Sequence, residues 1–189
     1  MLNFYKLIET LVTLQSLVIT TMLPVYIPLL FIHKSSNNID LPITWQIPTI
    51  ILLTLLFHKK VVFRAFSIYI ILGLFILPVF QQGGSLGYLL TPNFGYLLGV
   101  YPLIKIIDNL NSRNKIHVGN FLINGVMAIV AMHLTGIFYN FIQVIFFSQS
   151  NIFLYNLGKY SIGKIGYHFL MLLPLLLIIK PIKRLKNSK

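Results

Sequence analysis

Residues 76–102 read ILPVFQQGGSLGYLLTPNFGYLLGVYP, an apolar run interrupted in its middle by a polar, glycine-rich segment without any charge. Gln81 and Gln82 precede Gly83 and Gly84 there, and the chain turns apolar again at Tyr96. In a membrane, a segment with exposed backbone amides is tolerated only where protein or a water-filled cavity covers it. We therefore interpret this segment as the wall of a binding site.

The chain on both sides of this stretch is strongly hydrophobic. Of its 189 residues, 57% are hydrophobic and only 10% are charged. Its apolar runs repeatedly approach the roughly 20 residues that a helix needs to cross a bilayer. The first run is too long for the apolar region of a signal peptide, and no small-residue cleavage pattern follows it, so we expect it to be a membrane span.

The sequence predicts an all-α, polytopic membrane protein in which residues 1–189 form one transmembrane domain. We expect six transmembrane helices with irregular outer loops, over residues 4–32, 41–57, 61–80, 86–107, 118–147 and 165–182. Prolines near the end of the first span and the beginning of the second predict breaks there. Residues 148–164 are expected to form a polar loop before the last span.

The basic residues give this topology a direction. The net charge of +12 lies in clusters between the apolar runs, which favours contact with membrane lipid and not with nucleic acid. If both termini are cytoplasmic, twelve of the 15 basic residues lie inside, as the positive-inside rule requires, and three lie outside: Lys34, Lys159 and Lys164. The glycine-rich segment, residues 33–40 and the loop before the last span then share the outer side, where they can build one pocket.

The spans lack the groups of an ion-driven transporter or an enzyme. All three acids, Glu9, Asp40 and Asp108, lie in loops or at span ends, so no carboxylate is placed to couple an ion in mid-membrane. No P-loop, HExxH or HxxxH motif occurs, and the chain has no cysteine. We therefore expect no enzyme activity, no catalytic residues, no metal site and no cofactor. Any uphill transport must draw its energy from a partner.

Two ordered blocks resemble a known family. Residues 77–100, LPVFQQGGSLGYLLTPNFGYLLGV, resemble the pattern LPVFxGGGxGxxxLxGPTGGYLxGF of the BioY family, the biotin-binding S components of energy-coupling-factor (ECF) transporters. Upstream, residues 42–46, PITWQ, are similar to the PVTxQ pattern of the same family. The distance between the blocks and the six expected spans also fit, so the resemblance covers nearly the whole chain.

The resemblance implies a multi-pass protein of a prokaryotic inner membrane that captures biotin from outside. Its partners would be a transmembrane T component and two ABC-type ATPase subunits. Biotin carries a ureido ring, an apolar bicycle and a carboxylate, so its site needs neutral amides and hydroxyls, aromatic walls and a cation. We expect the following residues to contact it: Thr44, Gln46, Gln82, Gly83, Gly84, Tyr88, Asn93, Tyr96, Lys164, Tyr167 and His168.

One family pattern is altered. BioY-like chains commonly carry GDxxK at the start of the last span, and the corresponding place here, residues 166–170, reads GYHFL and has neither charge. Our hypothesis is that Tyr167 or His168 hydrogen-bonds the ureido ring and that Lys164 takes the carboxylate. We interpret His133 as a helix-to-helix hydrogen bond outside the site, and Gly95 with Gly99 as a packing face.

Two other hypotheses stay open at this stage. The same architecture can hold another small vitamin or a precursor. A polytopic scaffold protein without any solute would use the glycine-rich segment only as a re-entrant turn, because glycine is the default residue of tight turns.

Overall fold

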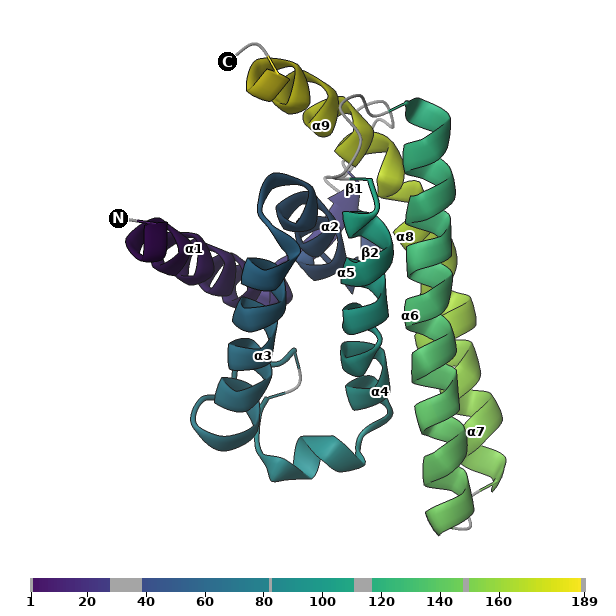
Figure 1. The fold of residues 1–189 in the computed structure, drawn as a ribbon. Coiled ribbons are helices and arrows are strands. Elements are labelled where there is room, and N and C mark those ends of the chain that lie inside the picture. Colours follow the sequence, from purple (N-terminus) through teal and green to yellow (C-terminus); the bar gives the residue numbers. More distant parts are fainter. Residues whose placement is uncertain (1, 28–38, 82, 111–116, 148–149, 188–189) are drawn as a thin grey trace, which may run out of the picture.

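The computed structural model describes residues 2–27, 39–81, 83–110, 117–147 and 150–187 and is mostly helical (Figure 1). Its elements are α1 Leu2–Met22, β1 Pro24–Ile27, β2 Ile39–Thr44, α2 Gln46–Leu56, α3 Lys59–Phe75, the 3₁₀ helix η1 Leu86–Leu90, α4 Pro92–Leu98, α5 Val100–Asp108, α6 Val118–Phe147, α7 Ser150–Asn156, the π-helical segment η2 Leu157–Ile162, α8 Gly163–Leu170 and α9 Leu172–Asn187. The predicted helical class is confirmed, with one short β-pair added to it.

The β-pair replaces parts of the first two predicted spans. β1 and β2 are antiparallel, with Pro24 opposite Thr44 and Ile27 opposite Ile39. The first helix therefore ends at Met22, two residues before a proline that cannot continue its hydrogen bonds. The rest of that predicted span, residues 28–32, lies outside the described residues. The second helix begins only at Gln46, once the pair has ended.

The remaining spans agree with the prediction to different degrees. α6 has the predicted limits, residues 118–147. The fourth span is broken into η1, α4 and α5, as its proline and glycines suggest, and α3 ends five residues earlier than expected. The predicted loop at residues 148–164 is wrong over residues 150–164, which form α7, η2 and the start of α8. Within the part of the chain that the structure describes, residues 118–146 and 153–179 are two helical runs long and apolar enough to cross a membrane.

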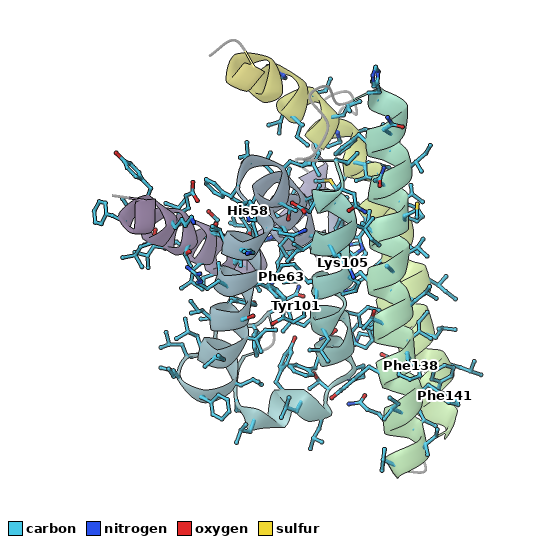
Figure 2. All side chains as sticks on the ribbon, in the orientation of Figure 1. His58, Phe63, Tyr101, Lys105, Phe138 and Phe141 are labelled. Carbon is cyan, nitrogen blue, oxygen red and sulfur yellow. The ribbon has the colours of Figure 1, made fainter. Side chains whose placement is uncertain are left out.

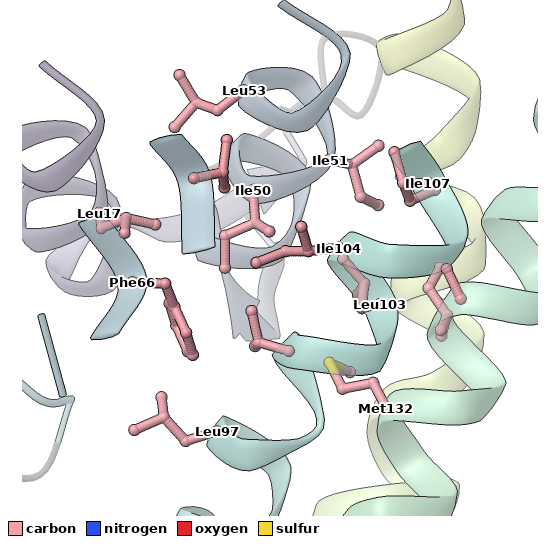
Figure 3. Close-up of a cluster of buried hydrophobic side chains, with 14 of the residues drawn as sticks. Leu17, Ile50, Ile51, Leu53, Phe66, Leu97, Leu103, Ile104, Ile107 and Met132 are labelled. Atoms are coloured by element: carbon pink, nitrogen blue, oxygen red, sulfur yellow. The ribbon is translucent and has the colours of Figure 1, made fainter. Parts of the chain in front are cut away.

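The helices form a bundle around a common apolar core. In Figure 1, α6 runs antiparallel to the α7–α8 run along one flank, and η1 joins the ends of α3 and α4 at the bottom of the view. Figure 3 shows the core between them, where Leu17 of α1, Ile50 of α2, Phe66 of α3, Ile104 of α5 and Met132 of α6 are all buried. Lipid-facing apolar surface remains outside this core, because a membrane does not require it to be covered.

Polar and aromatic contacts fix α3 against α5. The rings of Phe63 and Tyr101 stack with their centroids 5.7 Å apart (Figure 2). Lys59 Nζ lies 3.0 Å from Asp108 Oδ2, so the start of α3 and the end of α5 meet at one end of the bundle. This agrees with the predicted topology, in which both basic turns lie on the same side.

Glycine residues let α4 lie close to α6. A side chain at Gly95 would collide with Tyr139, and one at Gly99 would collide with the backbone of Met132. The predicted packing face of Gly95 and Gly99 is thus confirmed, and it holds α4 where its polar residues face the centre of the bundle.

Candidate functional site

A cavity of about 670 Å³, including its mouth, lies between the helices. Small-molecule sites combine apolar walls with a few placed polar groups, and the lining of this cavity has both. Residues from α1, β2, α2, α3, η1, α4, α5, α6, η2, α8 and the segment after α3 line it: Thr21, Ile43, Thr44, Gln46, Ile47, Tyr69, Phe80, Gln81, Tyr88, Asn93, Tyr96, Leu97, Val100, Met132, His133, Tyr160, Lys164 and His168.

The cavity brings together most of the side chains that the sequence singles out. Those that line it are Thr44, Gln46, Tyr88, Asn93, Tyr96, Lys164 and His168. They come from the glycine-rich stretch, from the loop and first turn of the last predicted span, and from Thr44 and Gln46 of the upstream family block. Of the third stretch expected at the pocket, residues 33–38 lie outside the described residues, and residues 39–40 are not in the lining. Their contact with a ligand stays a prediction, but their convergence is a property of the fold.

Three predicted residues lie outside the cavity lining, and a fourth is not described. Gln82 lies outside the described residues, and its neighbour Gln81 lines the cavity. Tyr167 is 38% exposed and is not among the lining residues, and neither are Gly83 and Gly84.

The two glycines build a tight turn that brings Gln81 to the cavity. The backbone groups of Phe80 and Gly83 exchange two hydrogen bonds of 3.0 Å, and Gly83 has a φ of 99°, which favours glycine. A side chain at Gly84 would lie 2.8 Å from the carbonyl oxygen of Leu77. Both positions therefore need glycine for the path of the backbone.

β2 and α2 position the first polar pair. Trp45 N donates to the Leu23 carbonyl at 3.0 Å, which fixes the passage from β2 into α2 and places Thr44 and Gln46 at the cavity. The Nε2 atom of Gln46 is buried and makes no hydrogen bond of normal geometry among the described residues, and the Tyr69 side chain lies near the Gln46 amide. An unpaired buried donor is costly, so this amide is available to a ligand acceptor.

A chain of hydrogen bonds crosses the other wall. Tyr96 Oη lies 2.6 Å from Ser161 Oγ, His133 Nδ1 lies 3.4 Å from the same oxygen, and His133 Nε2 lies 3.1 Å from His168 Nδ1. Ser161, His133 and His168 are all buried. The network thus joins α4, η2, α6 and α8 through uncharged groups.

His133 is one of several lining residues that the sequence analysis missed. It makes the predicted helix-to-helix hydrogen bond, to His168, but it also lines the cavity. Tyr69 Oη lies 3.0 Å from Thr21 Oγ1 and 3.2 Å from the Val79 carbonyl oxygen, and its ring is part of the wall. The presence of polar side chains within apolar spans was the sequence signal for these lining residues. That signal does not show which helix face a side chain occupies.

Lys164 supplies the positive charge of the cavity. Its Nζ lies 5.4 Å from the centroid of the Tyr160 ring, another lining residue. Where side chains are described, the ion pair of Lys59 and Asp108 is formed at the end of the bundle, and no carboxylate pairs with Lys164. A cation inside a membrane protein normally has a partner. The cavity is therefore suited to a ligand with an anionic group.

The histidines are not arranged to hold a metal. His133 and His168 bond each other, and no cluster of three or more His, Cys, Asp or Glu residues occurs in the described ranges. The arrangement of uncharged donors and acceptors, aromatic rings and one ammonium group is that of a site for an organic anion with a neutral polar head.

Comparisons with known proteins agree with this description. The model of the BioY family matches residues 6–178. A probable biotin transporter BioY from Lysinibacillus sphaericus is 31% identical over 107 residues, which are 54% of this chain and 53% of that protein, so the chain matches about half the length of this curated relative.

A solved structure has a similar fold. The S-component for biotin from an ECF-type ABC transporter aligns with a TM-score of 0.67 and 18% identity over 96% of this chain and 92% of that chain. At this identity the similarity concerns the fold alone.

Proposed function

Because this chain belongs to the BioY family, we propose that it is the substrate-binding S component of an ECF-type ABC transporter and captures biotin for uptake. BioY transporters are membrane proteins, and the two long apolar helical runs of the described chain agree with that environment. The proposal treats residues 1–189 as one transmembrane domain that binds its substrate without catalysis.

The observation that carries the proposal is the chemistry of the cavity. Lys164 provides a cation for the valerate carboxylate, with no acidic partner among the described side chains. Gln46 provides an unpaired amide N–H for the ureido carbonyl, and Asn93 and Tyr96 line the same space. Tyr88 and Phe80, whose ring centroids lie 4.4 Å apart, offer an aromatic wall for the bicycle.

The structure suggests that the family's GDxxK pattern corresponds to residues 160–164 and not to residues 166–170. The spacing of acid and lysine in GDxxK is also that of Ser161, at the end of η2, and Lys164, in the first turn of α8. Tyr167 lies outside the cavity lining. We infer that Ser161 stands where the family has its acid and that Lys164 keeps the family's lysine. Ser161 then acts through its bonds to Tyr96 and His133.

The energy for uptake is proposed to come from partners. The chain has three acidic residues in all, placed away from the predicted span centres, and no P-loop. A T component with two ABC-type ATPase subunits would supply the driving force. We propose a prokaryotic inner-membrane location with both termini in the cytoplasm, in contact with lipid and not with nucleic acid, and a cavity that opens outward.

Titration of the purified protein in neutral lipid nanodiscs tests the proposal. Trp45 is the only tryptophan and lies between two lining residues, so its fluorescence can report binding directly. We expect submicromolar affinity for biotin. Binding of another vitamin but not biotin would assign the architecture to a different solute, and failure to bind any vitamin would favour a scaffold protein.

A further inference from the structure

A second cation lies just outside the cavity wall. Lys159 Nζ is 5.3 Å from the centroid of the Tyr160 ring and 5.6 Å from that of Tyr155. Lys159 is exposed and Tyr155 is 64% exposed, so the ammonium group is held between two rings at the surface. Cation–π contacts of this kind restrict the position of a charge without neutralising it.

The Tyr160 ring contacts both this cation and the one inside the cavity. Tyr160 and Lys164 line the cavity, whereas Lys159 does not, and both ammonium groups contact the same ring. Tyr155 lies near the end of α7, and Lys159 and Tyr160 lie in the π-helical segment η2 that follows it. Short π-helical segments are frequent at functional sites, and this one carries part of the cavity wall.

The charges near Tyr160 are unbalanced. Two like charges on one ring repel each other, and no acidic side chain that the structure describes pairs with either lysine. An anion approaching the cavity would be attracted first by the exposed charge and then by the internal one.

We propose that Lys159, held by Tyr155 and Tyr160, is an entrance site that attracts the carboxylate of the ligand before Lys164 binds it. The inference rests on the proposed function only in requiring a ligand with a carboxylate. An exposed charge at the rim of a site changes the association rate and its salt dependence, while a buried charge pair changes the dissociation rate. Lys159 therefore determines how fast the ligand enters, and Lys164 determines how long it stays.

Stopped-flow fluorescence of Trp45 in neutral nanodiscs separates these roles. Lys159→Gln should lower the association rate constant for biotin about two- to tenfold at low ionic strength and leave the dissociation rate constant unchanged. The difference should disappear at 1 M salt, where the screening length is about 3 Å. Lys159→Arg, which keeps the charge, should behave as the wild type.

Two controls make the result specific. Lys105→Gln removes the same charge from α5, at the exposed Lys105 labelled in Figure 2 and away from the cavity lining, and should not slow association. Biotinamide, which has no carboxylate, should associate equally fast with the wild type and with Lys159→Gln.

The outcomes distinguish this inference from the proposed function. Biotin that binds Lys159→Gln as fast as the wild type would overturn the entrance site and leave the biotin site intact. An equal loss with Lys105→Gln, or with biotinamide, would overturn it as well. A wild-type protein that binds no biotin would instead overturn the proposed function.

Discussion

Replacing Lys164 with methionine removes the only lysine among the described residues that line the cavity, with little change in side-chain length. A hydrogen bond to a charged partner contributes about 1.5–3 kcal/mol, and each 1.4 kcal/mol changes an equilibrium constant about tenfold. The dissociation constant for biotin should therefore rise about 10- to 100-fold. The effect depends on the ligand carboxylate, because no described carboxylate pairs with Lys164 in the cavity.

The same substitution should have the opposite effect on the ligand-free protein. An ammonium group inside a membrane protein without a counter-charge is costly, so its removal should leave the thermal midpoint unchanged or raise it. At a fixed biotin concentration well above both dissociation constants, the stabilisation by biotin should fall by the same 1.5–3 kcal/mol or so. A misfolded variant would show a lower midpoint in both states.

Fluorescence titration with biotin and biotinamide, together with thermal unfolding in detergent, measures both effects. Biotinamide should bind Lys164→Met about as well as it binds the wild type, because it has no carboxylate to lose. Equal affinity of variant and wild type for biotin would show that Lys164 is outside the site. A parallel loss of affinity for both ligands would show that the lysine shapes the cavity and does not pair with the carboxylate.

Three further predictions test the fold and the site. Gly99→Ala forces a methyl group against the backbone of α6 and should lower stability by roughly 1–3 kcal/mol in thermal unfolding. Gly166→Ala, which adds a methyl group in open space, should be neutral or slightly stabilising. Equal thermal midpoints for the two variants would contradict the close helix contact. Gln46→Leu should weaken biotin binding by up to about tenfold in the fluorescence titration without destabilising the ligand-free protein, and unchanged affinity would remove its amide from the site. Tyr139→Phe removes a donor to the Leu89 carbonyl of η1, so the hydrogen-exchange rate of the η1 amides should rise and the stability should fall by about 1 kcal/mol. Unchanged protection of these amides would contradict this expectation.

Hydropathy predicted the spans well where polar loops bound an uninterrupted apolar run. α6 is such a case, and its limits were found. The predicted ends of the first and third spans lie too far toward the C-terminus, because an apolar β-strand or extended segment has the same hydropathy as a helix end. Pro24 was a signal of the break, but it does not tell that a strand follows.

The error over residues 150–164 has a different cause. The polar composition of the segment predicted a loop, yet two of its polar residues are buried and bonded across the bundle, Asn156 to Asn140 at 3.2 Å and Ser161 to Tyr96 at 2.6 Å. Polar side chains in a membrane bundle are commonly satisfied in this way. Local composition cannot distinguish such residues from loop residues, because the partner lies in another helix.

The site was predictable where sequence motifs bring backbone and side chains together, and not where helix packing does. Thr44, Gln46 and Tyr88 follow from the two family blocks, and the cavity contains them. Tyr69 and His133 become lining residues only because α3 and α6 present those faces to the centre, which depends on packing between distant segments.

The proposed ligand would compensate two groups that are unfavourable in the ligand-free protein. Gln46 Nε2 is a buried donor without a described partner, and Lys164 is a cation without a described counter-charge, while Tyr96, Ser161, His133 and nearby polar groups bond one another. Because an unsatisfied polar or charged group costs free energy, two of them in one cavity require a common compensation. A molecule with a neutral carbonyl at one end and a carboxylate at the other satisfies both at once, and biotin has this constitution. The binding energy is then concentrated at Gln46 and Lys164, so a ligand that lacks either end should bind much more weakly than the whole molecule.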